Sequence, residues 1–430
     1  MINELSIQAV KQALFRDNKL CRPLYKTYCF SKIPATIDFL FTGKDEQSAL
    51  PLDTVGGSFF DAEVVILILL DGFGWRFFEQ YQQRYPFLQK WLKQGICSKI
   101  TAQFPSTTAA QITSLHTGLE VGISGVYEWF YYEPVVDAII APLLTSFAGD
   151  KKIGTLCDAG VDTTLLYPGA TLYEKLQKKG IDAYLIQPAN IAHSPYSKVV
   201  CKGAHIAPYQ ELGDGLDGLL KLAKNTPQGD KRYIFLYFGD IDGAAHHHGL
   251  FSKPHEDAVH KALTLLDQKL GAYVLKEMGK RGALIVTADH GMIEVDPKTT
   301  CYINETMPEL TALIKKNQKN KPIVPAGSCR DLFLHFDEEH CDRAEALLLK
   351  HFEHTAWVVR TKKLIEEQFF GTTAPSKEFL SRVGDLVILP NGHGSVWWHE
   401  AHRFSQTFFA SHGGLSREEM ETIFLFERFG

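Results

Sequence analysis

The hydrophobic positions of this chain gather in near-continuous apolar runs, and each run predicts a buried strand. The strongest predicted strands are residues 62–72, 232–242, 282–291 and 420–429, with weaker ones at 151–159 and 181–189. Stretches with helical periodicity, such as 85–95 and 260–280, lie between them. Strands that are apolar on both faces and alternate with helices are typical of parallel sheets buried between two layers of helices. We therefore predict an α/β fold with a mostly parallel central sheet and helices on both faces.

The pattern changes over residues 301–395, where charge is more frequent and the periodicities predict strand, helix and strand in turn. We interpret this segment as a smaller inserted α+β subdomain that caps a site. Residues 1–60, with a predicted helix followed by short strands, form an N-terminal lead-in. The remaining segments, 61–300 and 396–430, then make up one core.

Composition and charge exclude several classes of protein. The chain carries 45 Lys and Arg against 50 Asp and Glu without long blocks of one sign, so we expect no nucleic-acid scaffold as a partner. The longest apolar run, residues 64–70, is far shorter than the ~20 residues that span a membrane. The N-terminus lacks the apolar core of a signal peptide, and the eight cysteines show no C-x-x-C spacing. We expect a soluble cytoplasmic protein with free thiols, and no oligomeric state follows from these features.

Carboxylates and imidazoles follow the predicted strands at the point where each strand ends. In open parallel sheets ligands bind beyond the carboxyl ends of the strands, so we expect these side chains to share one edge. They are Asp71, Asp242, His246, Asp289, His290 and, just before the last strand, His412. Such an edge suits two divalent cations, with zinc favoured by mixed His and Asp ligation and manganese as the alternative. Taken singly, Asp71 also fits a helix N-cap and residues 246–248 a solvated turn.

The stretch "FPSTTAAQITSLHTG" (104–118) admits two interpretations. Thr108 and Gln111 match a capping box, in which the threonine caps the helix and the glutamine returns the hydrogen bond. With Ser106 or Thr107 as the cap, Thr108 instead falls in the first turn, where orphan N–H groups bind phosphate. A hydroxyl there becomes a nucleophile if a nearby cation helps it to ionise. The spacing leaves both interpretations open.

Five motifs together resemble a known family. They are "LLDGFGW" (69–75), "FPSTTAAQITSLHTG" (104–118), "DIDGAAHHHG" (240–249), "VTADHGM" (286–292) and "SHGGLSREEM" (411–420). Their order resembles the type I phosphodiesterase/nucleotide pyrophosphatase branch of the alkaline phosphatase superfamily. The resemblance implies an alkaline-phosphatase-like core that binds two divalent metal ions, one on Asp71, Thr108, Asp289 and His290, the other on Asp242, His246 and His412.

The resemblance also implies roles in catalysis. Thr108 takes the last position of the motif Phe-Pro-x-x-Thr and is the expected nucleophile, which forms a phosphothreonine intermediate. Many members carry Asn three residues later as a donor to a phosphoryl oxygen; here Gln111 either keeps that role or returns to capping. His393 is a weaker rival of His412 as a ligand.

The resemblance implies a small-molecule phosphodiester or nucleotide substrate, hydrolysed at a phosphodiester or pyrophosphate bond. Residues 104–118 contain no Arg or Lys, which favours a diester over a dianionic monoester, although Arg330 or Lys253 remain candidate cations. Trp129, Phe130, Tyr131 and Tyr132 either stack on a flat group or pack under the cap. A phosphomonoesterase, phosphonate hydrolase or phosphomutase is the alternative on the same site. An inactive metal-stabilised binding protein is disfavoured because every metal position is filled.

Overall fold

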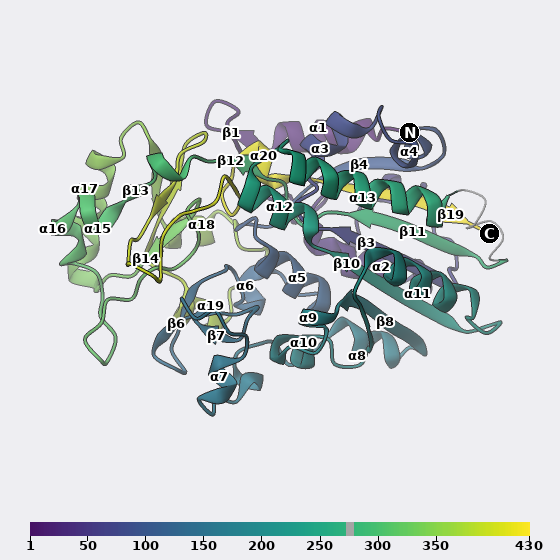
Figure 1. The fold of residues 1–430 in the computed structure, drawn as a ribbon, viewed down its shortest axis with the longest axis horizontal. Coiled ribbons are helices and arrows are strands. Elements are labelled where there is room, and N and C mark those ends of the chain that lie inside the picture. The colour runs from purple at the N-terminus through teal and green to yellow at the C-terminus, as the bar shows by residue number, and fades with distance from the viewer. Residues whose placement is uncertain (272–278) are drawn as a thin grey trace.

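The computed structural model describes residues 1–271 and 279–430. Its largest sheet there has the strand order β4–β19–β11–β3–β10–β8–β9 (Figure 1). The strands are β3 (Val64–Leu70), β4 (Ile96–Thr101), β8 (Ile181–Pro188), β9 (His205–Tyr209), β10 (Lys231–Phe238), β11 (Gly282–Thr287) and β19 (Glu421–Phe429). Within this sheet β19 alone runs antiparallel to its neighbours. The predicted mostly parallel sheet is confirmed.

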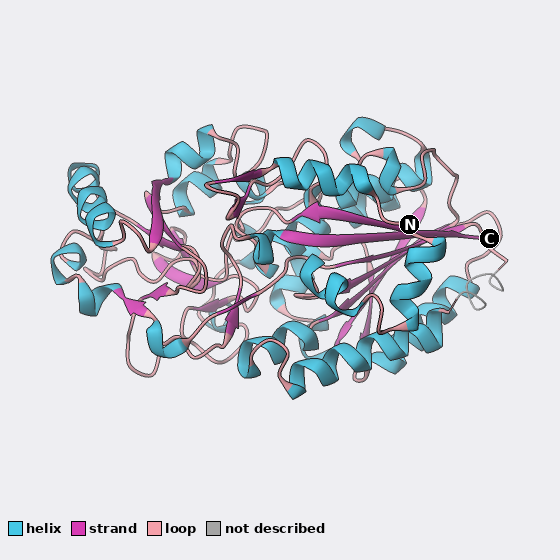
Figure 2. Ribbon diagram, turned by 90° about the horizontal axis from the view of Figure 1, so that it is seen from above, coloured by secondary structure: helices cyan, strands magenta, loops and turns pink. Residues whose placement is uncertain are grey.

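Helices cover both faces of the sheet, as predicted (Figure 2). Successive residues of a strand point to opposite faces, and β3 is buried along its whole length. Leu67 faces a core that it shares with α5 (Thr108–Thr117). Ile68 faces a second core, shared with α11 (Leu212–Lys224) and α13 (Lys253–Leu270). Burial on both faces explains why the strand is apolar at every position.

The three central strands end at one edge of the sheet. Because β3 is parallel to both β10 and β11, Leu69 pairs with Tyr237 on one side and with Thr287 on the other. The chain leaves β10 directly into α12 (Asp240–His248). Residues that follow these strands are therefore neighbours in space although they are far apart in sequence.

The lead-in segment packs onto the core. The helix α1 (Glu4–Gln12) lies against β4, and Asn3 Nδ2 donates to Ser98 Oγ at 2.9 Å. A second helix, α2 (Ile33–Thr42), contacts α5 and contributes the fully buried Ile37 to the core on that face.

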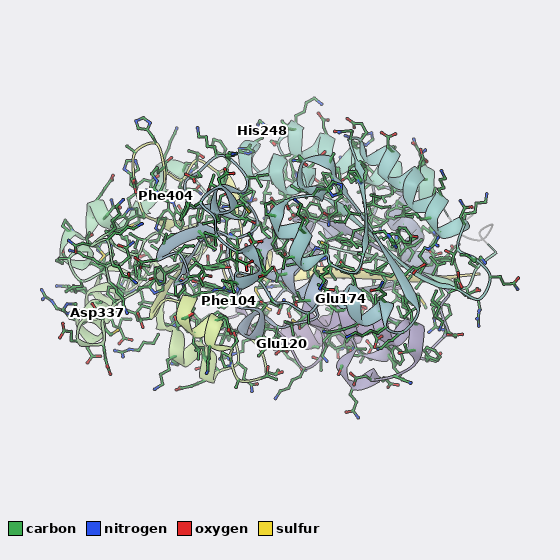
Figure 3. All side chains as sticks on the ribbon, turned by 90° about the horizontal axis from the view of Figure 1, so that it is seen from below. Phe104, Glu120, Glu174, His248, Asp337 and Phe404 are labelled. Atoms are coloured by element: carbon green, nitrogen blue, oxygen red, sulfur yellow. The ribbon has the colours of Figure 1, made fainter. Side chains whose placement is uncertain are left out.

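Much of residues 301–395 forms a lobe at one end of the molecule, although side chains such as Phe333 and Phe370 belong to the core shared with β3. Three antiparallel strands make its sheet, β14 (Leu332–Leu334), β16 (Leu386–Pro390) and β15 (Ala356–Arg360). The helix α17 (Glu338–His351) packs on one face of this sheet, in a separate apolar core that includes Leu348 and Ile388. Phe333 and Val387, on the other face, belong to the core shared with β3. The lobe lies at the opposite end of the molecule from both termini (Figure 1), with Asp337 near its outer end and Phe404 closer to the middle (Figure 3).

Two predicted elements differ from the structure or extend beyond its described residues. Residues 151–159 form no strand, and that prediction was wrong: Gly154 adopts a φ of +87° and begins a short helix, α7 (Thr155–Asp158), in which Leu156 alone is buried. The predicted helix over 260–280 is found as the end of α13, which closes at Leu270. Its remaining part, residues 272–278, lies outside the described residues.

The described helices include none with the length and apolar character that a bilayer crossing requires. All eight cysteines are free thiols, as their spacing predicts.

Gly291, next to His290, provides a test of the close packing at the sheet edge. A Cβ atom there would lie 2.1 Å from Glu418 O, and a Cβ atom built on Gly74 would lie 2.5 Å from the Gly291 Cα atom. We expect Gly291→Ala to lower the free energy of unfolding by about 1–3 kcal/mol, since backbone must move to admit the methyl group. Urea denaturation measures this change. Gly218→Ala in α11, where a Cβ meets nothing within 4 Å, is the control and should leave stability equal or higher.

Candidate active site

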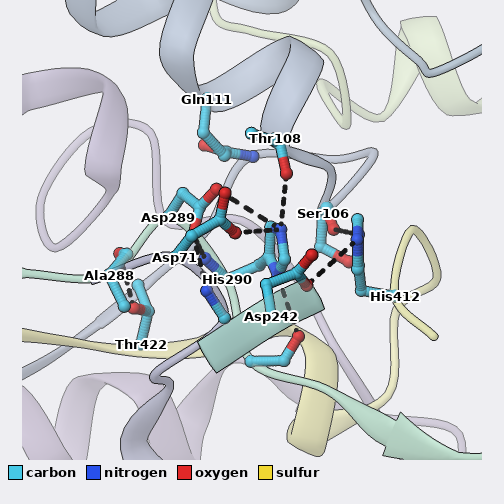
Figure 4. Close-up of polar contacts among 12 residues, drawn as sticks. Asp71, Ser106, Thr108, Gln111, Asp242, Ala288, Asp289, His290, His412 and Thr422 are labelled. Atoms are coloured by element: carbon cyan, nitrogen blue, oxygen red, sulfur yellow. Dashed lines mark hydrogen bonds and ion pairs between the residues drawn. The ribbon is translucent and has the colours of Figure 1, made fainter. Parts of the chain in front are cut away.

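The first group of side chains surrounds Thr108 and consists of Asp71, Asp289 and His290. His290 Nε2 lies 3.1 Å from Thr108 Oγ1, 3.3 Å from Asp289 Oδ2 and 3.5 Å from Asp71 Oδ1 (Figure 4). Asp289 Oδ1 accepts from the backbone N–H of Gly72. All three ligand candidates are buried. The structure thus brings together the end of β3, the end of β11 and the start of α5.

The second group consists of Asp242, His246 and His412. Asp242 Oδ2 lies 3.3 Å from His246 Nε2, and Asp242 Oδ1 lies 3.7 Å from His412 Nε2. The ring of His412 stacks on that of His290, with 3.7 Å between the centroids. Asp242 also falls within ligand distance of Asp71 and His290. The two groups therefore form one continuous cluster, shared through Asp242.

Backbone carbonyls fix the orientation of all three histidines. In each one Nδ1 donates to a carbonyl oxygen, because a carbonyl only accepts. The pairs are His246 with Ala410 (2.7 Å), His412 with Ser106 (3.0 Å) and His290 with Gly291 (3.0 Å). Each Nε2 then carries a free lone pair that points at carboxylate oxygens. A hydrogen bond from Nδ1 to a carbonyl oxygen commonly orients a histidine that binds metal through Nε2.

The donor set fits divalent cations. Asp71 Oδ1, Asp242 Oδ1 and Asp289 Oδ2 are buried and have no hydrogen-bond partner among the described residues. Burial raises the pKa of Asp71 well above its usual range, and the charges of Asp289 and Asp242 raise it further. Burial likewise lowers the pKa of His412, with His290 adding to the effect. A buried carboxylate with like charges beside it, such as Asp71, and an imidazole held neutral, such as that of His412, are both stabilised by a bound cation.

The start of α5 decides between the two interpretations of residues 104–118. Thr107 is the N-cap and makes no side-chain bond to the helix, so Thr108 is the first helical residue. The capping box of Thr108 and Gln111 is not formed. Thr108 lies in the first turn, with its hydroxyl directed at His290 (Figure 4).

The role expected for Gln111 requires correction. Its Nε2 donates to Gln103 O (3.1 Å) and Pro105 O (3.2 Å), and its Oε1 accepts from Gln103 N (3.2 Å). Both amide hydrogens are therefore used within the protein. Gln111 is fully buried and holds the loop that precedes Thr108, rather than offering a donor to substrate.

Three further candidates lie away from the site. His393 is exposed and its Nδ1 donates to Glu294 O. Arg330 is buried in an ion pair with Glu419, with 3.0 Å between Nη2 and Oε2, and Lys253 pairs with an aspartate on an exposed helix surface. Neither cation lines a cavity that borders Thr108.

Two cavities meet at Thr108. The larger, of about 330 Å³, is lined by both histidines of the second group and by Phe130, Trp397, Phe404 and Phe408. The smaller, of about 230 Å³, borders Asp71 and is lined by Ile112, Leu143, Leu144, Ile191 and Phe235. Thr108, Trp129 and Asp242 line both. Of the four aromatic residues singled out in the sequence, Trp129 and Phe130 line these cavities. Tyr131 packs against Arg382, and Tyr132 bonds to Asp137.

Sequence reasoning missed two residues. Tyr237 donates its hydroxyl hydrogen to Asp71 Oδ2; its only signal is a tyrosine near the end of the apolar strand β10. Glu128 is fully buried at the wall of the larger cavity. Burial raises the pKa of Glu128 to about 8. A glutamate between aromatic residues, in "YEWFYY", was the available signal.

The chain matches the family model of type I phosphodiesterases/nucleotide pyrophosphatases over residues 65–414. It belongs to this family. Membership agrees with the motif resemblance and makes the chain a metal-dependent phosphoric ester hydrolase of the alkaline phosphatase superfamily. No curated protein sequence matches the chain.

Solved structures of low sequence identity share its fold. Murine ectonucleotide pyrophosphatase/phosphodiesterase 5, in an inactive form in complex with AMP, has a TM-score of 0.62 at 17% identity, covering 84% of this chain and 87% of that one. The human protein has a TM-score of 0.59 at 16% identity, covering 84% and 87%. Phosphonoacetate hydrolase from Sinorhizobium meliloti, in complex with phosphonoformate, has a TM-score of 0.59 at 16% identity, covering 88% and 93%. The shared fold is alkaline-phosphatase-like.

Metal binding should stabilise the protein. At a free Zn²⁺ or Mn²⁺ concentration of 100 times the dissociation constant, linkage adds about 2.7 kcal/mol to the free energy of unfolding, and a chelator removes it. Thermal denaturation measures the shift. Asp242→Asn should lose most of the metal-induced stabilisation, because Asp242 belongs to both groups. Asp240→Asn, an exposed position in the same helix, is the control, and equal stabilisation of both variants would contradict the assignment.

Gln111→Leu should act on stability rather than on chemistry. The change leaves buried backbone groups of Gln103 and Pro105 without partners, at about 1–3 kcal/mol for each group. Urea denaturation should show the loss, with Gln83→Leu on the surface as the control. A variant of wild-type stability with strongly reduced kcat would show that Gln111 does contact substrate.

Proposed function

We propose that the protein is a two-metal phosphodiesterase/nucleotide pyrophosphatase that works through a phosphothreonine intermediate on Thr108. The observation that carries this proposal is the position of the Thr108 hydroxyl, at the junction of two cavities and beside the cluster of buried carboxylates and imidazoles. The first group with Thr108 would hold one ion and the second group the other. Zinc is the proposed metal, since mixed histidine and carboxylate ligation suits it.

The residues of the chain account for the steps of the reaction. When bound, the two ions favour ionisation of the hydroxyl and neutralise charge on the phosphoryl oxygens. Thr108 Oγ1 then forms a bond to phosphorus while the bond to the leaving oxygen breaks, and water later cleaves the phosphothreonine. The first turn of α5 directs backbone N–H groups toward the phosphoryl group. Burial of Thr108, which is 9% exposed, limits competing attack by water.

Two features support a diester rather than a monoester. A diester carries two substituents, and the two cavities that meet at Thr108 provide one binding region for each. A dianionic monoester needs cationic partners, yet among the described residues lining these cavities Arg403 is the only Lys or Arg, and it is paired with Glu400. A phosphomonoesterase, phosphomutase or phosphonate hydrolase is thereby less well supported. We also propose a cytoplasmic location, which the free cysteines favour.

The proposal predicts a preference between two synthetic esters. With zinc-loaded protein, kcat/KM for bis-p-nitrophenyl phosphate should exceed that for p-nitrophenyl phosphate, because only the diester fills both cavities. Thr108→Ala should lower both values by about a thousandfold or more. Most of the metal-induced stabilisation should remain, because the carboxylates and imidazoles of both groups are unchanged. Release of p-nitrophenol is the readout.

Thr117→Ala, at the other end of α5, is the matched control and should keep its activity. A higher value for the monoester would favour a phosphomonoesterase. Metal binding without any turnover that depends on Thr108 would favour an inactive binding protein.

A further inference from the structure

The larger cavity lies on the side where the leaving group of the proposed reaction would stand, opposite the Thr108 hydroxyl. Thr108 Oγ1 belongs with the first group, 3.1 Å from His290 Nε2. In an in-line displacement the leaving oxygen stands opposite the attacking one, which places it toward the second group. His246 and His412 of that group line the larger cavity. This cavity therefore receives the leaving substituent, and the smaller cavity receives the substituent that stays on phosphorus.

Aromatic rings make up much of the wall of the larger cavity. Phe130 stacks on Trp397, with 6.3 Å between centroids and 29° between planes. Phe404 meets Phe130 edge to face at 5.8 Å, and Phe408 packs on His246 at 4.6 Å. These rings come from the 125–134 loop and from residues 396–409, far apart in sequence. Aromatic rings of this kind bind apolar or flat groups favourably, and they provide no charge or hydrogen-bond donor for a phosphate.

Among the described residues that line it, the larger cavity offers no unpaired Lys or Arg to an anionic leaving group. Arg403 Nη1 donates to Glu400 Oε1 at 3.0 Å and Nη2 donates to Ala148 O at 2.8 Å, while the guanidinium lies over Phe404. The one Arg among the described residues that line the cavity is thus already paired, which leaves no free guanidinium for a phosphate.

Building on the proposed function, we infer that the leaving substituent is an aromatic or apolar alcohol that carries no phosphate. Phe404 and Trp397 are then specificity-determining residues. Nucleoside triphosphates, which would place a pyrophosphate in this cavity, are poor substrates, although they contain a bond that the same chemistry cleaves.

Two substrates that share the retained group separate these classes. The p-nitrophenyl ester of thymidine 5′-phosphate and thymidine triphosphate differ only in what leaves. We expect kcat/KM for the ester to be higher by about a hundredfold or more. Phe404→Ala should lower the value for the ester about tenfold or more and leave that for the triphosphate unchanged, because only the ester's leaving group contacts the ring. For Phe404→Leu, which keeps an apolar wall, kcat/KM for the ester should lie between the values of the wild type and of Phe404→Ala. Phe409→Ala, an exposed neighbour, is the matched control.

A second variant tests the charge argument without altering the aromatic wall. Glu400→Gln removes the partner of Arg403, and we expect kcat/KM for the triphosphate to rise several-fold while that for the ester stays constant. Preference for the triphosphate in the wild type, or an ester-to-triphosphate ratio that Phe404→Ala leaves unchanged, would overturn the inference. If neither substrate is turned over in a way that depends on Thr108, the proposed function itself fails, and the inference with it.

Discussion

The repulsion between buried carboxylates at the edge of the sheet is the constraint on which the rest of the structure depends. Asp71 and Asp289 are buried, and the partly buried Asp242 lies within ligand distance of Asp71. Removal of each charge from water costs several kcal/mol. The arrangement persists because β3, β10 and β11 are buried on both faces and hold the residues that follow them in fixed register. The stability of the apolar sheet opposes the repulsion and keeps the carboxylates close enough to bind cations.

Chemistry and selectivity come from different parts of the chain. The core strands and α5 supply the nucleophile and most candidate ligands, whereas the wall of the larger cavity comes from a loop and from the segment that returns from the inserted lobe. The second group of ligand candidates connects the core with the cavity wall, because His412 follows the returning segment directly. Changes in the wall can therefore alter what is cleaved without altering how it is cleaved, which agrees with the general separation of fold and function.

The sequence predicted what depends on local pattern. Strands that are apolar throughout predicted the sheet, and the polar residues after them predicted the cluster, because parallel strands end at one edge. It misjudged Gln111, whose partners lie in a loop whose path no periodicity specifies. It missed Tyr237 and Glu128, since a buried polar residue inside an apolar stretch gains meaning only from its neighbours in space. Residues 151–159 were read as a strand because short apolar runs do not distinguish strand from helix.

The position of β19 has a consequence for how the molecule is assembled during synthesis. This strand lies between β4 and β11, so those two strands cannot join one sheet until residue 429 has been made. Until then β4 lacks its only strand partner of the large sheet, and the apolar edge of β11 is open to unwanted pairing. A ribosome that stalls anywhere in the inserted lobe therefore holds a chain whose metal ligands are nearly all present but whose sheet is still divided. We expect such a nascent chain to depend on chaperones.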